Sequence, residues 1–286
     1  MTKTMNNVMT PNATAAAAQS ATPPAAAPQM ATASQPVGVK TAPATKPAVD
    51  NARTEVVFVL DRSGSMGGRE ADVIGNFNKV IADQKRRPGE CTVSVVLFDD
   101  TAEVLLDRVP LADVRDLTER DYDVRGCTAY YDALGRAIRH HIRVQRHLPT
   151  ERRAEKVMFV VMTDGLENAS RDYSGAALRR LLAEEQQKWG WEFLFFGADI
   201  DAIEAARHIG IKAENAISML GDSQGYGVSY DCVGSAISNV RERRAMSQNA
   251  DGTSYRAHVD HDYSVRSKRP PHWQTNSFSM GDIMPR

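Results

Sequence analysis

Short runs of consecutive apolar residues, separated by stretches with a helical period, fill the middle of the sequence. The runs are rich in β-branched and aromatic residues, which favours strands. We expect strands at 54–60, 91–98, 102–106, 156–162, 191–196 and 215–220. Apolar positions spaced three or four residues apart predict helices at 70–85, 129–145, 174–188, 201–208 and 227–243.

The predicted elements follow one another mostly as strand then helix. Strands that are apolar throughout, rather than alternating, indicate a parallel sheet covered on both faces. The turn at Asp99-Asp100 is short, so the run at 102–106 is expected to pair antiparallel with the strand before it. The sequence therefore predicts an α/β fold: a doubly wound, mostly parallel central sheet with one antiparallel edge strand.

Both ends of the chain depart from this pattern. Residues 1–52 are mainly Ala, Pro, Thr, Gln and Ser, and they hold too few large apolar side chains to offset the entropy of ordering. We predict a disordered tail there. Residues 246–286 are polar again and are predicted to be mostly disordered. The folded domain is expected at 53–245.

Composition and charge narrow the class of protein. A formal net charge of −1 provides no overall field that would attract nucleic acid. The three cysteines are widely spaced, which matches neither a disulfide framework nor a zinc site and suits a reducing compartment. No apolar run approaches the roughly 20 residues that cross a bilayer, and the N-terminus lacks a secretory pattern. We therefore expect a cytoplasmic protein without a membrane segment.

Oxygen-bearing side chains gather where predicted strands end. In "VVFVLDRSGSM", Asp61, Ser63 and Ser65 occupy alternate positions directly after the first strand. Asp164, in "VVMTDGLEN", follows the strand at 156–162, and Thr128, in "RGCTAYYDA", precedes a helix. Doubly wound sheets bind ligands at the carboxyl ends of their strands, where the strand order reverses. These side chains are therefore expected to meet in one crevice.

The five side chains offer oxygen and neither nitrogen nor sulfur, which are the ligands of a hard divalent cation. A small cluster that leaves room for water favours Mg²⁺, with Mn²⁺ and Ca²⁺ as alternatives. In an extended loop Ser63 and Ser65 would face the same way. Asp61 and Asp164 can act through water and by orienting the serines. Helix capping is the other interpretation of the first three residues, but it leaves the remaining two unexplained.

At these residues the chain resembles the von Willebrand factor type A domain family. The metal-ion-dependent adhesion site of that family has an Asp-x-Ser-x-Ser signature, a distant Thr and a distant Asp. They correspond to Asp61, Ser63, Ser65, Thr128 and Asp164 of this sequence. The resemblance spans roughly residues 54–243. The phrases "TDGLENASRDYS" and "WGWEFLFFGADID" are similar to an intracellular branch found in bacteria and their phages.

The resemblance implies a Rossmann-like fold and a non-enzymatic, metal-dependent adaptor or scaffold. In such a module an Asp or Glu of a protein partner completes the metal shell. Many intracellular members work beside AAA+ ATPases or in stress-response gene clusters, so a partner of that kind is expected.

Two other functions agree with parts of the sequence. A Mg²⁺-dependent phosphoryl-transfer or hydrolytic enzyme could use Asp61 as its nucleophile, in the manner of a haloacid-dehalogenase-like fold. Such enzymes place their general acid two residues on, where this chain has Ser63. A nucleic-acid-associated role would rest on the cations of the C-terminal tail. They are scattered among acids, which does not favour that role: Arg256, Arg266, Lys268 and Arg269.

Overall fold

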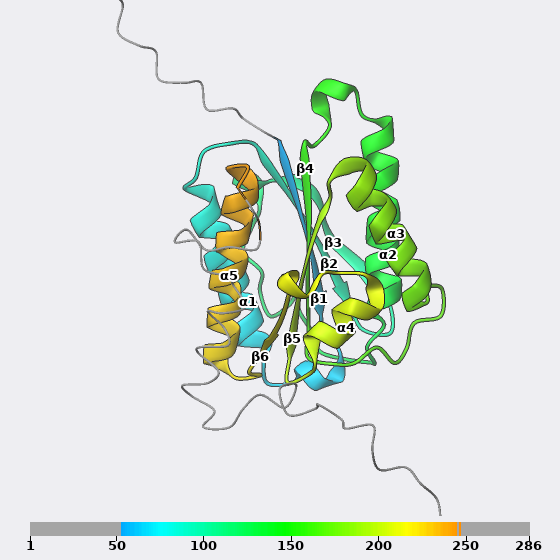
Figure 1. Cartoon of the computed structure of the whole chain (residues 1–286). Coiled ribbons are helices and arrows are strands. Elements are labelled where there is room, and N and C mark those ends of the chain that lie inside the picture. The colour runs from blue at the N-terminus through cyan, green and yellow to red at the C-terminus, as the bar shows by residue number, and fades with distance from the viewer. Residues whose placement is uncertain (1–52, 245, 247–286) are drawn as a thin grey trace, which may run out of the picture. The chain divides into compact units, whose positions relative to one another are not determined.

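The computed structural model describes residues 53–244 and 246, and this part of the chain is a central sheet with helices on both faces (Figure 1). The strands are β1 (Thr54–Asp61), β2 (Cys91–Phe98), β3 (Ala102–Pro110), β4 (Lys156–Thr163), β5 (Glu192–Ala198) and β6 (Ala216–Met219). The α-helices are α1 (Glu70–Lys85), α2 (Tyr130–His147), α3 (Gly175–Trp189), α4 (Ala202–Ile209) and α5 (Ser223–Arg241). The predicted tail at 1–52 lies outside the described residues, and so does the predicted tail at 246–286 except for Met246, which is buried. No helix within those residues is both long enough and apolar enough to cross a membrane.

The strands lie in the order β3-β2-β1-β4-β5-β6. The pair β2–β3 is antiparallel, and the other neighbouring strands are parallel. The predicted α/β fold, with its mostly parallel sheet and one antiparallel edge strand, is confirmed. The chain moves from β1 to β2 on one side and later to β4 on the other, so the strand order reverses between β1 and β4. The carboxyl ends of these two strands flank the place where such sheets bind ligands.

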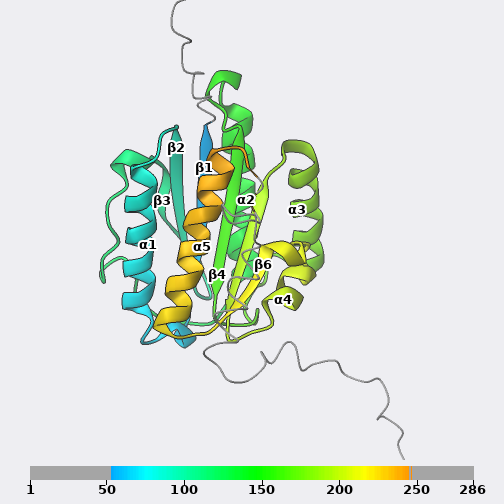
Figure 2. The same cartoon turned by 60° about the vertical axis from the view of Figure 1, so that its left-hand side comes forward.

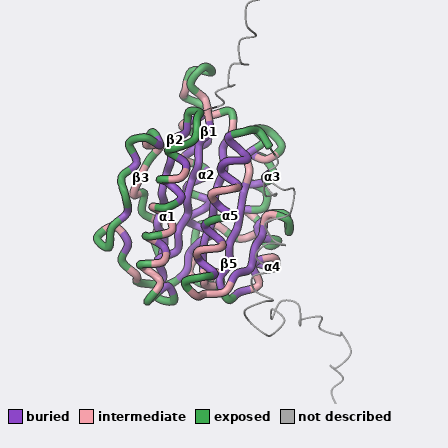
Figure 3. The backbone as a smooth tube through the Cα atoms, turned by 90° about the vertical axis from the view of Figure 1, so that its left-hand side faces the viewer, coloured by how far each residue is buried: buried purple, intermediate pink, exposed green. Residues whose placement is uncertain are grey.

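Successive residues of β1 point into two separate cores. Val56 and Phe58 belong to the core that α1 and α5 cover, whereas Val57 and Val59 belong to the core under α2, α3 and α4 (Figure 2). Figure 3 shows the parallel strands as the most continuously buried part of the domain, whereas the edge strand β3 is partly exposed. A strand that is apolar on both faces is thus held by two layers of helices, and this fixes the position of its last residue, Asp61.

Helix α5 begins at Ser223, four residues before the predicted start at 227. The glycines of "GDSQGYG" weaken the helical pattern before residue 227, but the helix begins within this stretch. The Asp222 side chain accepts a hydrogen bond from the N–H of Gly225 (2.8 Å) and caps the helix. A Cβ at Gly225 would lie 2.1 Å from the Leu220 carbonyl oxygen, so close packing explains this glycine.

Candidate metal centre

The carboxylate of Asp61 lies beneath the site and is almost fully buried, with 1% of the residue exposed. One of its oxygens accepts the N–H of Ser63 (2.7 Å), and the other accepts the hydroxyl of Thr163 (2.5 Å). Tyr122 donates its hydroxyl to the Asp61 carbonyl oxygen. Burial raises the pKa of Asp61 to about 6, the nearby charge of Asp164 adds to the rise, and the hydrogen bonds from Thr163 and Ser63 oppose it.

Four further oxygens form a row above Asp61. The Thr128 hydroxyl donates to Ser63 Oγ (3.1 Å), and Ser63 Oγ lies 3.1 Å from Ser65 Oγ. Ser65 in turn donates to Asp164 Oδ1 (2.5 Å). The structure therefore brings the five predicted residues together, from loops that are far apart in the sequence. Thr128 and Ser63 are buried, whereas Ser65 is exposed and opens the row to solvent.

The loop after β1 is tighter than the sequence suggested. We expected an extended loop, but Gly64–Met66 form a turn of 3-10 helix. The N–H of Met66 donates to the Ser63 carbonyl oxygen (2.9 Å), and this bond closes the turn. Gly64 N–H also donates to the Gly126 carbonyl oxygen (3.1 Å). The two serine hydroxyls still meet, because the turn brings Ser65 back over Ser63.

The loop that carries Thr128 is fastened to the loop that carries Asp164. The N–H of Thr128 donates to Asn168 Oδ1 (2.9 Å), and the N–H of Asn168 donates to the Thr128 carbonyl oxygen (3.0 Å). Gly165 allows the close approach, since a Cβ there would lie 2.7 Å from Thr128 Oγ1. Both loops are therefore placed by backbone bonds and not by the side-chain oxygens alone.

Arg62, between Asp61 and Ser63 in the sequence, points away from the oxygen row and is 2% exposed. Its guanidinium donates to Asp99 (2.9 Å), Glu103 (2.9 Å) and Asp123 (3.3 Å). The Arg62 N–H also donates to the Phe98 carbonyl oxygen (2.8 Å). Arg62 thus fixes the loop after β1 to the segment that follows β2. Because the side chain of Arg62 points away, those of Asp61 and Ser63 on either side of it can face the site.

Asp164 is half-buried beside a further acid. Burial raises its pKa, the hydrogen bond from Ser65 opposes the rise, and the negative charge of Asp199 adds to it. Asp199 directly follows β5 and has a left-handed backbone, with φ of 55°. A cation bound in the row would relieve the repulsion between these carboxylates, because an opposite charge favours their ionised form.

Sequence reasoning missed four residues that shape the site: Thr163, Asn168, Arg62 and Asp199. Thr163 directly precedes Asp164 in "MTDGLEN" and Asn168 follows it by four residues, so their place in that loop was a usable signal. Arg62 and Asp199 act through contacts between distant segments. Such contacts leave no local pattern in the sequence.

The spacing of the hydroxyl oxygens fits a divalent cation. An octahedral Mg²⁺ shell with oxygens at about 2.1 Å places adjacent oxygens about 3.0 Å apart. The Thr128–Ser63 and Ser63–Ser65 separations are both 3.1 Å. Within the part of the chain that the structure describes, no group of three or more His, Cys, Asp or Glu side chains could hold a metal. A cation here would therefore depend on hydroxyl oxygens, which is the donor set predicted from the sequence.

The family model described as von Willebrand factor type A domain matches residues 56–167. This segment runs from β1 past β4 and contains the five residues of the oxygen cluster. That part of the chain is thus similar in sequence to von Willebrand factor type A domains. The mostly parallel sheet has the Rossmann-like topology of that fold. No curated protein sequence matches the chain.

Several solved structures are similar to the fold. A von Willebrand factor type A protein from Catenulispora acidiphila is 15% identical, with a TM-score of 0.41, and the match covers 64% of this chain and 42% of that one. Proximal thread matrix protein 1 from the mussel byssus, with a zinc-occupied MIDAS (metal-ion-dependent adhesion site) motif, is 19% identical with a TM-score of 0.46. That match covers 65% of this chain and 46% of that one. Manganese-loaded TRAP protein of Plasmodium vivax is 19% identical with a TM-score of 0.38, and the match covers 51% of this chain and 57% of that one. The chain spans less than two thirds of each of these proteins.

Proposed function

We propose that this protein is a divalent-cation-dependent protein-binding module. The observation that carries the proposal is the row of hydroxyl oxygens that opens to solvent at Ser65, with carboxylates beneath and beside it. Thr128, Ser63 and Ser65 would hold the ion. Mg²⁺ is the proposed ion, and a bound divalent cation would supply an electrophilic position that accepts a carboxylate oxygen.

The chain's own residues would do two things for such a partner. Asp61 and Asp164 hold Ser63 and Ser65 in place, and they supply negative charge without filling the open side of the row. Neutral hydroxyls leave most of the charge of a cation unquenched, so an Asp or Glu side chain of the partner would be attracted to it. The exposed Leu166, 62% exposed and two residues after Asp164, offers apolar contact at the rim.

We propose a binding role in preference to catalysis because Asp61 is poorly placed as a nucleophile. Both of its oxygens already accept hydrogen bonds, and the residue is 1% exposed. Ser63 stands where haloacid-dehalogenase-like enzymes carry their general acid, and a serine hydroxyl is too weak an acid for that role near neutral pH. A Mg²⁺-dependent phosphotransferase or hydrolase is thus the less favoured interpretation of the same oxygens.

The setting of the protein is part of the proposal. Its resemblance to intracellular bacterial and phage proteins favours a cytoplasmic adaptor or scaffold, with an AAA+ ATPase or a stress-response protein as its partner. The C-terminal cations that suggested the nucleic-acid alternative lie outside the described residues, and no described contact favours that alternative.

Metal binding and partner binding can be tested with one pair of variants. Ser63→Ala removes the central hydroxyl of the row, and Ser235→Ala removes a half-buried hydroxyl on α5. Electron paramagnetic resonance titration should show Mn²⁺ binding to the wild type and to Ser235→Ala, and at least tenfold weaker binding to Ser63→Ala. Immobilised full-length protein should retain its partner in Mg²⁺ and release it in EDTA.

A partner captured in this way should lose affinity when one of its Asp or Glu residues is changed to Asn or Gln. Equal capture in Mg²⁺ and EDTA, by a wild type that binds Mn²⁺, would reject the metal-dependent part of the proposal. Mn²⁺ affinity that is unchanged in Ser63→Ala would reject the site itself.

A further inference from the structure

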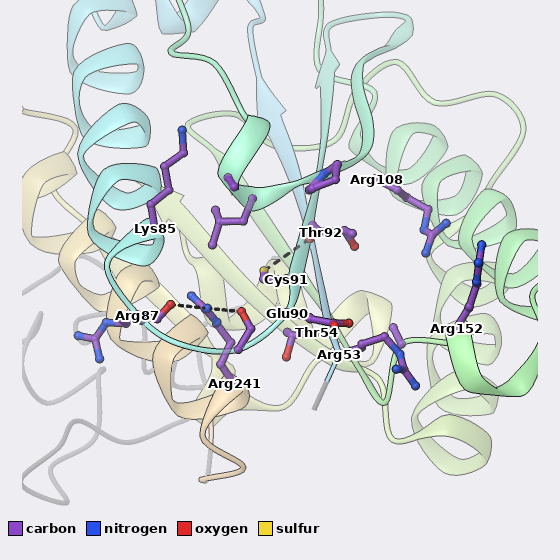
Figure 4. A pocket seen from close by; sticks show the side chains of 15 residues that line it. Arg53, Thr54, Lys85, Arg87, Glu90, Cys91, Thr92, Arg108, Arg152 and Arg241 are labelled. Carbon is purple, nitrogen blue, oxygen red and sulfur yellow. Dashed lines mark hydrogen bonds between the residues drawn. The ribbon is translucent and has the colours of Figure 1, made fainter. Parts of the chain in front are cut away.

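A cavity lies at the opposite end of the sheet from the oxygen cluster. It has a volume of about 560 Å³, and its wall includes Thr54 and Cys91, the first residues of β1 and β2 (Figure 4). Asp61 is at the other end of β1, seven residues after Thr54. With a rise of about 3.3 Å per residue, the two sites are separated by roughly 23 Å. The cavity is therefore a separate feature from the candidate metal centre.

Positive charge dominates the wall of this cavity. Figure 4 shows cationic side chains on both sides of it. One side has the end of α1, the loop after it and α5, and the other has the residue before β1, β3 and the segment before β4: Lys85, Arg87, Arg241, Arg53, Arg108 and Arg152. Glu90 is the only carboxylate among the lining residues. A cavity with this balance attracts anions.

Three of these cations are engaged by the fold. Arg108 pairs with the buried Glu55 (3.0 Å), and Arg87 lies 3.4 Å from Glu242. The guanidinium of Arg241 donates to main-chain carbonyl oxygens of the loop between α1 and β2. These three side chains are therefore held in the wall of the cavity by the fold.

The other three cations have no carboxylate partner among the described residues. Arg53 donates through Nε to the Arg153 carbonyl oxygen (3.1 Å), and Lys85 donates to the Val114 carbonyl oxygen (2.6 Å). Arg152 is exposed at the rim. Arg241 likewise has no carboxylate partner among the described residues, so the unpaired positive charge of the cavity is carried by four side chains: Arg53, Lys85, Arg152 and Arg241.

Two buried polar atoms at the cavity lack a hydrogen-bond partner. They are Thr54 Oγ1 and Arg241 Nε, in residues that are 2% and 8% exposed. Buried polar groups in folded proteins are nearly always satisfied by protein, water or ligand. Both residues belong to the lining of this cavity.

The backbone at Arg108 is strained where it meets the cavity. Its φ is +52°, in the left-handed region that side chains other than glycine seldom adopt. The register of β2 and β3 shifts here, and the Arg108 N–H donates to the side-chain oxygen of Ser94 in β2 (2.9 Å). Bulges and strained residues of this kind redirect side chains at functional sites. Here the bulge turns an edge-strand residue toward Glu55 and the cavity wall.

We propose that this cavity binds a small organic phosphate of nucleotide size. Guanidinium groups match phosphate oxygens in geometry and charge. Apolar residues, among them Cys91, Leu111 and Ala154, supply contact for the rest of the molecule. The volume lies within the range of small-molecule sites. The proposal does not rest on the proposed metal-dependent function, because the two sites share no residue.

The test uses full-length protein in EDTA, so that a phosphate cannot bind through a cation at the oxygen cluster. Isothermal titration calorimetry with AMP, adenosine and inorganic phosphate separates the contributions of the phosphate and of the apolar body. AMP should bind more tightly than either of the others, and the affinity should fall as ionic strength rises.

Variants locate the site. Arg152→Gln and Arg53→Gln should each weaken AMP binding about 10- to 100-fold, the loss expected for one charge-assisted contact. Arg180→Gln, an exposed position on α3, is the matched control and should bind as the wild type does. Ser63→Ala should also bind as the wild type does, because it alters only the oxygen cluster.

Four outcomes would overturn the proposal. The first is no heat of binding with millimolar AMP, and the second is binding of adenosine or of inorganic phosphate as tight as that of AMP. The third is the same loss of AMP affinity in Arg180→Gln as in Arg152→Gln, and the fourth is loss of AMP binding in Ser63→Ala. The last outcome would place the phosphate at the oxygen cluster. Circular dichroism of each variant checks that it is folded.

Discussion

Replacing Asp61 by Asn should stabilise the metal-free protein while removing its response to metal. The carboxylate is buried and has a raised pKa, so its ionised form is held in an unfavourable place near neutral pH. Asparagine keeps the shape, and its oxygen can still accept the N–H of Ser63. Thr163, which loses a carboxylate acceptor, can direct its hydroxyl to the Gly165 carbonyl oxygen 3.1 Å away.

The size of the effect follows from the pKa. Burial first, and then the charge of Asp164, raise the pKa of Asp61 from 3.8 to about 6 in the folded protein. A difference of this size corresponds to about 3 kcal/mol between the two protonation states. The folded pKa lies above the unfolded one, so the stabilising contribution of the protonated carboxyl is complete below pH 3.8 and is lost as the pH rises through about 6.

In EDTA at pH 7.5 we therefore expect Asp61→Asn to be more stable than the wild type by about 1–3 kcal/mol, the lower figure allowing for a weaker hydrogen bond to Thr163. The advantage should vanish near pH 4. Urea unfolding followed by circular dichroism, at pH 4 to 8, measures it. Added Mg²⁺ should stabilise the wild type, by about 2.7 kcal/mol at 100 times the Kd, and should leave the variant unchanged.

Asp113→Asn changes an exposed carboxylate and serves as the control. If Asp61→Asn were less stable than the wild type in EDTA at every pH, burial of the charge would not be the dominant energy at this position. If both proteins gained equally from Mg²⁺, Asp61 would have no part in the cation site. Either result would refute the link between the buried charge of Asp61 and cation binding.

The other predictions concern the rest of the site. Asp164→Asn should weaken Mn²⁺ binding about 10- to 100-fold, measured by paramagnetic resonance, because it removes the charge that orients a ligand. Thr128→Ser should bind Mn²⁺ within a few-fold of the wild type, whereas Thr128→Ala should bind it more weakly and lose more of the partner affinity. Gly165→Ala should lower both Mn²⁺ affinity and Tm, since its Cβ would lie 2.7 Å from Thr128 Oγ1. Burial alone would raise the pKa of Asp99, but hydrogen bonds from Thr101 help to lower it from 3.8 to about 2. Its stabilisation, on the order of 1–2 kcal/mol, should thus be present above pH 3.8 and be lost toward pH 2 in acid unfolding, but not in Asp99→Asn.

The positions of the strands along the chain and the members of the oxygen cluster could be predicted because each has a local signal. Apolar runs end directly before Asp61 and near Asp164, and topology alone brings such ends together. The tight turn after Ser63 could not be predicted, because bonds to distant residues such as Gly126 help to hold its backbone. The start of α5 was misplaced because glycine weakens the helical signal, while the cap at Asp222 overrides it.

The basic cavity had no sequence signal at all. Its cations are spread from Arg53 to Arg241, and each of them alone is typical of a solvated surface. The strain at Arg108 and the unpartnered Thr54 hydroxyl exist only in the folded chain. Sites assembled from single residues on many elements therefore require a structure, whereas sites built on a short motif do not.

The two hydrogen bonds between Thr128 and Asn168, one to the Asn168 side chain and one between backbones, bear on how quickly a partner can associate. Loops that must order on binding lose conformational entropy at that moment and slow the formation of the complex. Here the entropy of both loops is lost when the sheet folds, well before any encounter. Association should therefore be limited by diffusion and by the release of water from the exposed Ser65 and the half-buried Asp164. Differences in affinity between partners should arise mainly in the rate of dissociation.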